Sequence, residues 1–259
     1  MLSGKAIRDD LVNFAGRIHF GCAGWSLPRS EWPQFPRSGT HLQRYAARFD
    51  AVEINSSFYR PHRRQTYARW AASVSDDFRF AVKLPKTITH TLRLRGVEDE
   101  IAAFLEQATG LGNKLGCLLV QLPPSLKFER AVAENFFRQL RARHGGDIAC
   151  EPRHASWFRP QVDELQERHR IARVAVDPTR VPAAAEPGGF RQMVYYRWHG
   201  APRMYYSKYE EHALATLAER LRASAAAGAR TWCVFDNTAL GAAIDDARRL
   251  QAMLGTAAQ

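Results

Sequence analysis

Polar side chains recur near the ends of short apolar runs along this sequence. Glu53 and Asn55 alternate with apolar residues in AVEIN, and Glu151 and Arg153 alternate in ACEPR. Other polar residues at such positions are Lys83, Gln121, Asp177, Arg197, His199, Asp236 and Asn237. Because side chains two residues apart in a strand share one face, each alternating pair is predicted to point the same way. Carboxylates, cationic side chains and an imidazole on one face could bind an anion and transfer protons.

These residue types favour an enzyme that acts by hydrolysis or isomerisation on an anionic, phosphate-bearing substrate, such as a nucleotide or nucleic acid. The expected proton-transfer residues are Glu53 or Glu151 as general base and His199 or His90 as proton carrier. The expected binding residues are the cations Lys83, Arg153 and Arg197, the polar residues Asn55, Gln121, Asp177 and Asn237, and the aromatic residues Trp25, Tyr59, Trp157 and Tyr206, which could stack a base or sugar.

The same charges could instead hold the fold together. Burying an unpaired charge is costly, so charges that converge indicate either a site or a network of ion pairs. In such a network Glu53 would pair with Lys83, and Glu151 would pair with Arg153 or Arg197.

The elements that must position these residues alternate between short apolar runs and longer amphipathic ones, which is typical of βα units around a parallel sheet. Strands are predicted at 18–22, 51–55, 78–84, 116–122, 147–153, 171–177, 194–200 and 231–237. Helices are predicted at 40–49, 64–73, 99–109, 129–141 and 210–227. The sequence therefore predicts an α/β fold, a single-domain TIM-type (β/α)₈ barrel over residues 18–255, after an N-terminal extension of residues 1–17. Polar residues at the carboxyl ends of its strands would lie on the face where barrel active sites form.

One connection departs from the pattern. The segment PTRVPAAAEPGGFRQM between the sixth and seventh strands contains three prolines and two adjacent glycines. Proline and glycine both disfavour helix interiors, so the sixth helix is predicted to be short or missing. Long loops after the first and third strands could cover a pocket.

Composition bounds the partners and the compartment. A formal net charge of +11 favours an anionic small molecule or nucleic acid, although no block of like charges marks a binding tail. No apolar run is long enough to span a membrane and no secretion signal opens the chain, so a cytoplasmic protein is predicted. The four cysteines Cys22, Cys117, Cys150 and Cys233 lie singly in apolar runs and are predicted to be buried, reduced thiols. The sequence makes no prediction of oligomeric state.

Several strings together resemble one known family over residues 18–250. They are GCAGW (21–25), YAARFDAVEINSSFYR (45–60), FRFAVKLPKTITH (78–90), LGCLLVQLPPS (115–125), CEPRHASW (150–157), YYRWHG (195–200) and DNTALGAAIDDA (236–247). They resemble the domain-of-unknown-function-72 family, also called YecE-like. The resemblance implies a TIM-barrel fold and no agreed biochemical function, with family-level suggestions of nucleic acid or another phosphate-bearing ligand.

Other functions remain open beside the phosphate-directed enzyme. A glycoside-processing barrel would use Glu53 and Glu151 as its carboxyl pair, and a non-catalytic nucleic-acid-binding module would use surface arginines and exposed aromatics. A divalent metal held by Glu53, Glu151, Asp177 and His199 is possible but disfavoured, because no HxH or HExxH spacing is present and nearby cations would neutralise the carboxylates. No cofactor is predicted, since GCAGW lacks the GxGxxG spacing of a dinucleotide site.

Overall fold

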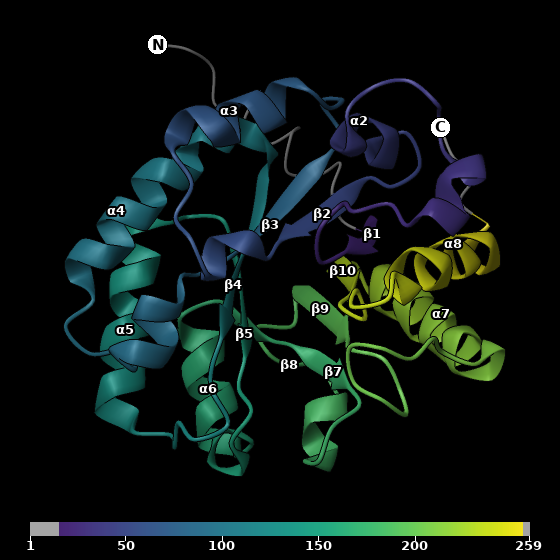
Figure 1. The fold of residues 1–259 in the computed structure, drawn as a ribbon. Coiled ribbons are helices and arrows are strands. Elements are labelled where there is room, and N and C mark those ends of the chain that lie inside the picture. The colour runs from purple at the N-terminus through teal and green to yellow at the C-terminus, as the bar shows by residue number, and fades with distance from the viewer. Residues whose placement is uncertain (1–15, 256–259) are drawn as a thin grey trace, which may run out of the picture.

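The structure, a computed structural model, describes residues 16–255, in which strands and helices alternate along the chain (Figure 1). The strands are β1 (Ile18–Cys22), β2 (Ala51–Ile54), β3 (Arg79–Lys83), β4 (Leu115–Gln121), β5 (Asp147–Glu151), β6 (Ile171–Arg173), β7 (Ala175–Asp177), β8 (Gly188–Gly189), β9 (Met193–Trp198) and β10 (Arg230–Phe235). The α-helices are α2 (His41–Ala46), α3 (Arg64–Ala72), α4 (Glu98–Ala108), α5 (Arg130–Arg143), α6 (Pro160–Arg168), α7 (Glu211–Ala226) and α8 (Ala242–Leu254). Most of the predicted N-terminal extension lies outside the described residues.

The strands form two largely parallel sheets. One has the order β1-β10-β9-β7 and the other β2-β3-β4-β5-β6-β8, in which only β8 is antiparallel to its neighbour. The predicted alternation of strands and helices around parallel sheets is confirmed, and seven of the eight predicted strands match within two residues at each end. The seventh and eighth end earlier, at Trp198 and Phe235, and the sixth is divided at Val174 into β6 and β7.

The two sheets approach each other at both edges. At one edge Ala23, just after β1, forms a single parallel bridge with Glu53 of β2, and the Gly24 amide donates to the Glu53 carbonyl at 2.9 Å. At the other edge Val174 alone separates β6, which pairs with β5, from β7, which pairs with β9. A continuous hydrogen-bonded ring is not formed by the described strands, so the predicted closed barrel is matched only at the level of parallel α/β sheets.

Helices cover the outside of the strands (Figure 1). Helices α3 to α6 lie along β2 to β5, while α7 and α8 pack on β10, with α8 also against β1. The larger buried cluster fills the space between strands and helices. A second cluster, called here the interior cluster, takes residues from both sheets: Ala23, Ala51, Ala81, Cys117, Leu119, Ala149, Ala172, Val174, Phe190, Met193, Tyr195, Trp232 and Val234.

The connection between β7 and β9 has no α-helix, as its sequence predicts. A 3-10 helix, Pro182–Ala185, begins at a proline and ends after four residues, and Gly188–Gly189 then pair with β6. Gly189 has φ of +60°, and a Cβ there would lie 2.5 Å from the Ile171 carbonyl oxygen, so the close approach to β6 requires glycine.

The four cysteines are free and buried, as predicted. Within residues 16–255, no helix combines the length and the apolar character needed to cross a membrane.

Candidate functional site

The inward-facing polar residues continue the interior cluster by one step along each strand. Two positions beyond Ala51, Ala81, Leu119, Ala149, Tyr195 and Val234 of that cluster lie Glu53, Lys83, Gln121, Glu151, Arg197 and Asp236, all buried. Because side chains two residues apart share a face of the strand, these six residues form a polar layer above the apolar one. The prediction that they point inward together is confirmed.

Arg197 of β9 lies at the centre of this layer. Its guanidinium donates to both carboxylate oxygens of Glu53, at 2.9 Å from Nε and 2.8 Å from Nη2. Nη1 donates to Glu151 at 3.0 Å, and Nη2 lies 2.9 Å from Asp236. Tyr195 donates its hydroxyl to Glu53 at 2.9 Å. Arg197 and Glu53 are fully buried, so neither side chain is open to a ligand.

Electrostatics keep this group ionised. Burial opposes the charge on Arg197, but the carboxylates of Asp236, Glu53 and Glu151 raise its pKa well above the ordinary value. Burial would likewise raise the pKa of Glu151, yet Arg153, Arg197 and His199 bring that pKa well below its usual range. Despite burial, Arg197 and His199 also lower the pKa of Asp236, so Glu151 and Asp236 are hydrogen-bond acceptors rather than proton donors.

Arg153 and His199 extend the group toward the surface. Arg153 donates from Nε to Glu151 at 2.8 Å and from both terminal nitrogens to the Tyr205 hydroxyl at 3.2 Å. His199 binds Asp236 through Nδ1 at 3.0 Å, and its Nε2 lies 3.4 Å from Glu151. Burial alone would lower the pKa of His199, but Glu151 and Asp236 raise it above the ordinary value. With His199 protonated, three cations balance three carboxylates in this group.

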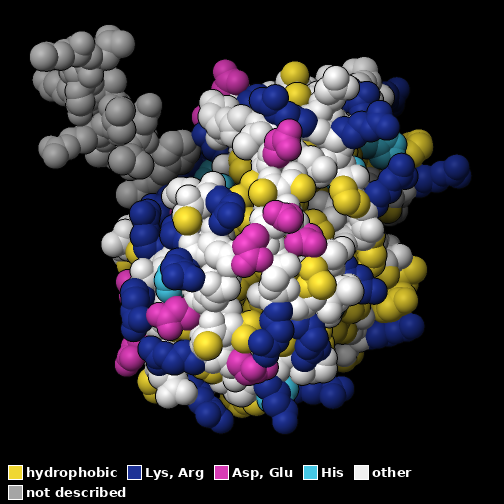
Figure 2. Space-filling view, turned by 90° about the vertical axis from the view of Figure 1, so that its left-hand side faces the viewer, with side chains coloured by type: hydrophobic (Ala, Val, Ile, Leu, Met, Phe, Trp, Pro, Cys, Tyr) yellow, Lys and Arg dark blue, Asp and Glu magenta, His cyan; other side chains and the backbone are white. Residues whose placement is uncertain are grey.

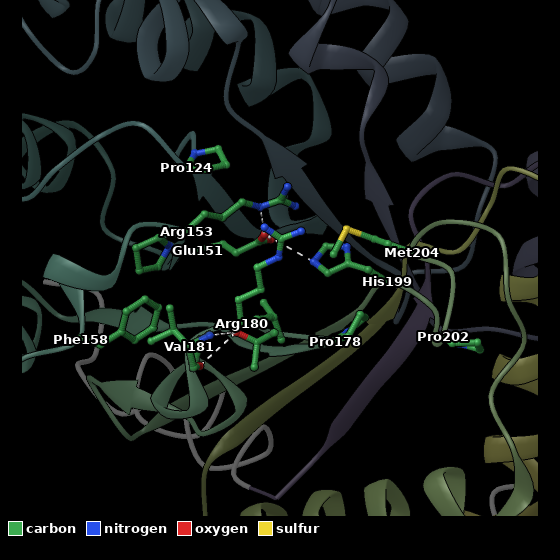
Figure 3. Close-up of a pocket in the computed structure, with 14 residues that line it drawn as sticks. Pro124, Glu151, Arg153, Phe158, Pro178, Arg180, Val181, His199, Pro202 and Met204 are labelled. Atoms are coloured by element: carbon green, nitrogen blue, oxygen red, sulfur yellow. Dashed lines mark hydrogen bonds and ion pairs between the residues drawn. The ribbon is translucent and has the colours of Figure 1, made fainter.

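A cavity of about 560 Å³, called here the His199 cavity, opens beside it (Figure 3). In Figure 3 the side chains of Arg153, Arg180 and His199 converge around Glu151. The remaining wall is mainly apolar and comes from Pro124, Pro152, Phe158, Val176, Pro178, Thr179, Val181, Ala184, Pro202 and Met204.

A second cavity of about 440 Å³, called here the Lys83 cavity, adjoins the first. Its lining residues are Asn55, Phe58, Tyr59, Lys83, Lys86, His90, Gln121, Tyr205, Asp236, Thr238 and Ala239. Two hydrogen-bonded pairs, Arg153 with Tyr205 and His199 with Asp236, join the linings of the two cavities. These pairs form a shared boundary between the two cavities.

Three polar side chains in the Lys83 cavity have no protein partner in the part of the chain that the structure describes. Lys83 and Gln121 form no side-chain hydrogen bond or ion pair there, and Asn55 Oδ1 is buried without a donor. Buried polar groups are nearly always hydrogen-bonded, so Asn55 Oδ1 is unusual in having no donor, and it lies in the same cavity lining as Lys83 and Gln121.

Burial and nearby cations depress the basicity of two lining residues. Burial, with a further contribution from Arg197, lowers the pKa of Lys83 to about 8, and its Nζ lies 4.1 Å from the Phe58 ring centre. Burial, with Lys83 and Arg153, lowers the pKa of His90 to about 4. At neutral pH His90 is therefore an uncharged imidazole.

Among the predicted ion pairs, Glu151 binds both Arg153 and Arg197. The predicted pair of Glu53 with Lys83 is wrong, because Arg197 occupies both oxygens of Glu53.

Several other candidates lie away from the cavities. Trp157 is buried in the outer core and donates from Nε1 to the Leu126 carbonyl at 2.9 Å. Asn237 is fully buried and donates to the Ser207 carbonyl and to Asp246. The aromatic Trp25 packs edge-to-face on Trp70. These contacts are structural.

The loops place the remaining candidates differently. Tyr59 is 78% exposed at the rim of the Lys83 cavity, while Tyr206 is 38% exposed and packs under the Arg203 guanidinium outside both cavities. Asp177 ends β7 next to the His199 cavity but is not part of its lining. The neighbour of Tyr206, Tyr205, reaches the site instead.

Sequence reasoning does not select Tyr195, Tyr205, Lys86 and Arg180. Tyr205 has a φ of +70°, which is uncommon for a residue other than glycine and occurs often at functional sites. Nothing in the local sequence indicates that turn. Lys86 follows the strand-end Lys83 by three residues, and this spacing is the one signal that could have found it.

The carboxylates of the metal hypothesis have other partners. Glu53 and Glu151, two of the four proposed ligands, bind arginines through all four of their oxygens. The residues present therefore fit a metal poorly.

The parallel sheets, the helices outside them and the polar layer at the strand ends define an α/β protein. Within that class, a family model described as "Protein of unknown function DUF72" matches residues 19–259, and the chain belongs to this family. The curated UPF0759 protein YecE of Escherichia coli K12 is 37% identical over 166 residues, which is 61% of this chain and 60% of YecE. The chain thus aligns with less than two thirds of that relative's length.

Solved structures show the same fold. A DUF72 family protein from Enterococcus faecalis V583 superposes with a TM-score of 0.78 at 23% identity, covering 94% of this chain and 97% of that one. A fusion protein containing a xylose isomerase-like TIM barrel gives a TM-score of 0.52 at 14% identity, over 92% of this chain and 43% of the fusion.

Proposed function

We propose that this chain is a TIM-barrel enzyme that acts on a small, phosphate-bearing substrate in the two cavities above the polar layer. Closure of the two sheets into one eight-stranded barrel is supported by the Ala23–Glu53 bridge at one edge and by the continuity of β6 and β7 at the other. The interior cluster, which takes residues from both sheets, and the likeness to a TIM barrel support it further. The site would then occupy the face that TIM-barrel enzymes use.

The observation that carries the proposal is a set of three cations without a protein partner. Lys83, Lys86 and Arg180 line the cavities and form no ion pair with any described residue. The neighbouring group of three carboxylates with Arg153, Arg197 and His199 is already balanced, so these three charges are in excess. An unpaired cation in a cavity attracts phosphate. Its desolvation costs little free energy, because the bound anion replaces the water.

The size of the cavities supports a small substrate. Their volumes of about 560 and 440 Å³ lie in the ordinary range for small-molecule pockets. On the face shown in Figure 2, Lys and Arg side chains are spread among Asp and Glu rather than gathered in one stripe. This pattern favours a cavity ligand over the alternative of an extended nucleic-acid surface.

The roles of the predicted residues follow from their exposure. Arg197 and Glu53 are buried and position the layer. His199, whose pKa is raised, faces the first cavity as a proton donor, and neutral His90 faces the second as a proton acceptor. Arg153 and Arg180, which both line the first cavity, would bind the anion there.

A glycoside-processing role fits less well. Such enzymes need one carboxyl group that carries a proton at neutral pH. Glu151 is ionised because its pKa is lowered, and both Glu53 and Glu151 are bound to the same Arg197.

Calorimetric titration with inorganic phosphate and with a panel of phosphorylated sugars and nucleotides tests the proposal. Arg180→Met is expected to weaken binding about tenfold, the loss of one charged hydrogen bond. Arg69→Met, an exposed arginine on α3, is the matched control and should bind as the unaltered chain does.

Equal phosphate binding by Arg180→Met and Arg69→Met, or no binding at millimolar concentration, would overturn the proposal. Binding of a single-stranded oligonucleotide that phosphate does not displace, and that Arg180→Met retains, would instead favour the nucleic-acid-binding module.

A further inference from the structure

The amine of Lys83, at the end of β3, is buried but borders a cavity. Lys83 is 5% exposed, its Nζ rests against one face of the Phe58 ring, and the rest of its surroundings are the Lys83 cavity. No carboxylate oxygen of the described chain lies within 4.0 Å of this nitrogen, since Glu53, Glu151 and Asp236 are taken up by Arg197, Arg153 and His199. Lysine is rarely buried without a partner. Because Lys83 has no carboxylate partner, it does not stabilise the fold as a member of an ion pair.

We propose that Lys83 is a nucleophile that forms an imine with the carbonyl group of a small aldehyde or ketone bound in the Lys83 cavity. This inference rests on the proposed function for the phosphate group of that substrate. It adds the carbonyl as the second chemical feature that the site recognises.

The surroundings of Lys83 make its amine reactive near neutral pH. The charged and titratable groups that face it are Glu53 from β2, Glu151 from β5, Arg197 from β9, Asp236 after β10, Lys86 and His90 from the segment after β3, and Arg153 after β5. With a pKa of about 8, about one amine in four is uncharged at pH 7.5, against about one in a thousand for a lysine with the ordinary value. Only the uncharged form has the lone pair that attacks a carbonyl carbon.

The chemistry balances without any oxidant or reductant. The Nζ lone pair bonds to the carbonyl carbon, and the carbonyl oxygen takes a proton to give a carbinolamine. The proton that the oxygen takes is one of the two on Nζ. A second proton, from solvent, then lets that oxygen leave as water as the C–O bond breaks and the nitrogen lone pair forms the C=N bond. The iminium nitrogen keeps its other proton. The positive iminium withdraws electrons from the adjacent carbon and makes a C–H bond there acidic.

Groups for the remaining steps line the same cavity. His90 packs against the same Phe58 ring as Lys83, with ring centres 4.8 Å apart, and as a neutral imidazole it can accept the proton from that C–H bond. The unpartnered amides of Asn55 and Gln121 can bind hydroxyl groups of the substrate. The site therefore fits a phosphorylated hydroxy-aldehyde or hydroxy-ketone.

Borohydride trapping tests the inference, because reduction turns the imine into a stable secondary amine. The full chain is incubated with dihydroxyacetone phosphate, or with dihydroxyacetone, and sodium cyanoborohydride, and the adduct is located by peptide mass spectrometry. We expect one adduct, on Lys83, with at least tenfold less labelling in Lys83→Met and unchanged labelling of that site in the matched control Lys127→Met, which replaces an exposed lysine outside both cavities. Labelling spread evenly over Lys86, Lys127 and Lys208 without excess at Lys83 would overturn the inference.

A second measurement does not depend on the variant. Pulse labelling of the unaltered chain with a trace of acetic anhydride across pH 6 to 11 should show Lys83 reacting with a midpoint near the lowered value of about 8. A midpoint above 10 for Lys83 contradicts the proposal.

The two probes also separate this inference from the proposed function. Equal trapping of dihydroxyacetone and its phosphate leaves the imine in place and removes the phosphate-directed function. Phosphate binding without any trapped carbonyl leaves that function in place and removes the imine.

Discussion

Methionine at position 83 would fill nearly the volume of the lysine stem without bringing a charge into the Lys83 cavity. The fold lowers the pKa of Lys83 from 10.5 to about 8, which means that the protonated side chain opposes folding by about 3 kcal/mol at pH 7. Loss of the contact between Nζ and the Phe58 ring offsets about 1 kcal/mol of this. Lys83→Met is therefore expected to stabilise the protein by about 2 kcal/mol, or about 4–8 °C in Tm.

The effect of Lys83→Met on stability should depend on pH. Between pH 8 and 10.5 the unfolded chain binds a proton at Lys83 that the folded chain has released, so the stability of the unaltered protein rises with pH in this window. The advantage of Lys83→Met should then shrink to less than half by about pH 9.5. Urea denaturation of both proteins at pH 7 and pH 9.5 measures it, with Lys86→Met as an exposed control that stays within about 0.5 kcal/mol. A destabilised Lys83→Met, or a difference that does not change with pH, would refute the reasoning.

Three further outcomes follow from contacts of the site and core. Arg197→Met removes a cation that three buried carboxylates share and leaves Glu53 without a cationic partner, so it should cost about 3–5 kcal/mol in urea denaturation, whereas a loss under 1 kcal/mol would mean that the carboxylates are not held as described. The raised pKa of His199 contributes stability that is fully present below about pH 6.5 and is lost as pH rises through the folded value, so His199→Gln should lose more stability at pH 5.5 than at pH 9, and an equal loss would contradict this. Trp157→Ala should lower the free energy of unfolding by about 3–5 kcal/mol without changing phosphate affinity. Weaker phosphate binding by a variant that is still folded would mean that Trp157 contributes to the binding site.

The inward direction of the polar layer could be predicted because polar and apolar residues alternate with a two-residue period within each strand. Glu53 and Lys83 could not be assigned to their partners in the same way. Arg197 lies 144 positions from Glu53, and their meeting depends on how far each strand is staggered around the interior, which no local pattern encodes.

The aromatic candidates show the limit of reading loops. Trp157 and Tyr206 both follow strands that contribute to the site, yet one turns into the outer core and the other onto the surface. Tyr205 reaches the cavity through a left-handed backbone conformation that its sequence does not signal. Loop direction depends on tertiary packing, so it becomes visible only in the structure.

The connection after β7, which contains a short 3-10 helix but no α-helix, supplies Pro178, Thr179, Arg180, Val181 and Ala184 to the lining of the His199 cavity. These residues contribute no hydrogen bond to the parallel ladders, while Glu53 and Arg197 on the opposite side tie the strands together. Under the proposed function, substrate choice would depend on this connection and structural integrity on the polar layer. An experimenter who wishes to redirect this protein toward a new ligand can rewrite residues 178–184 and leave the rest of the architecture untouched.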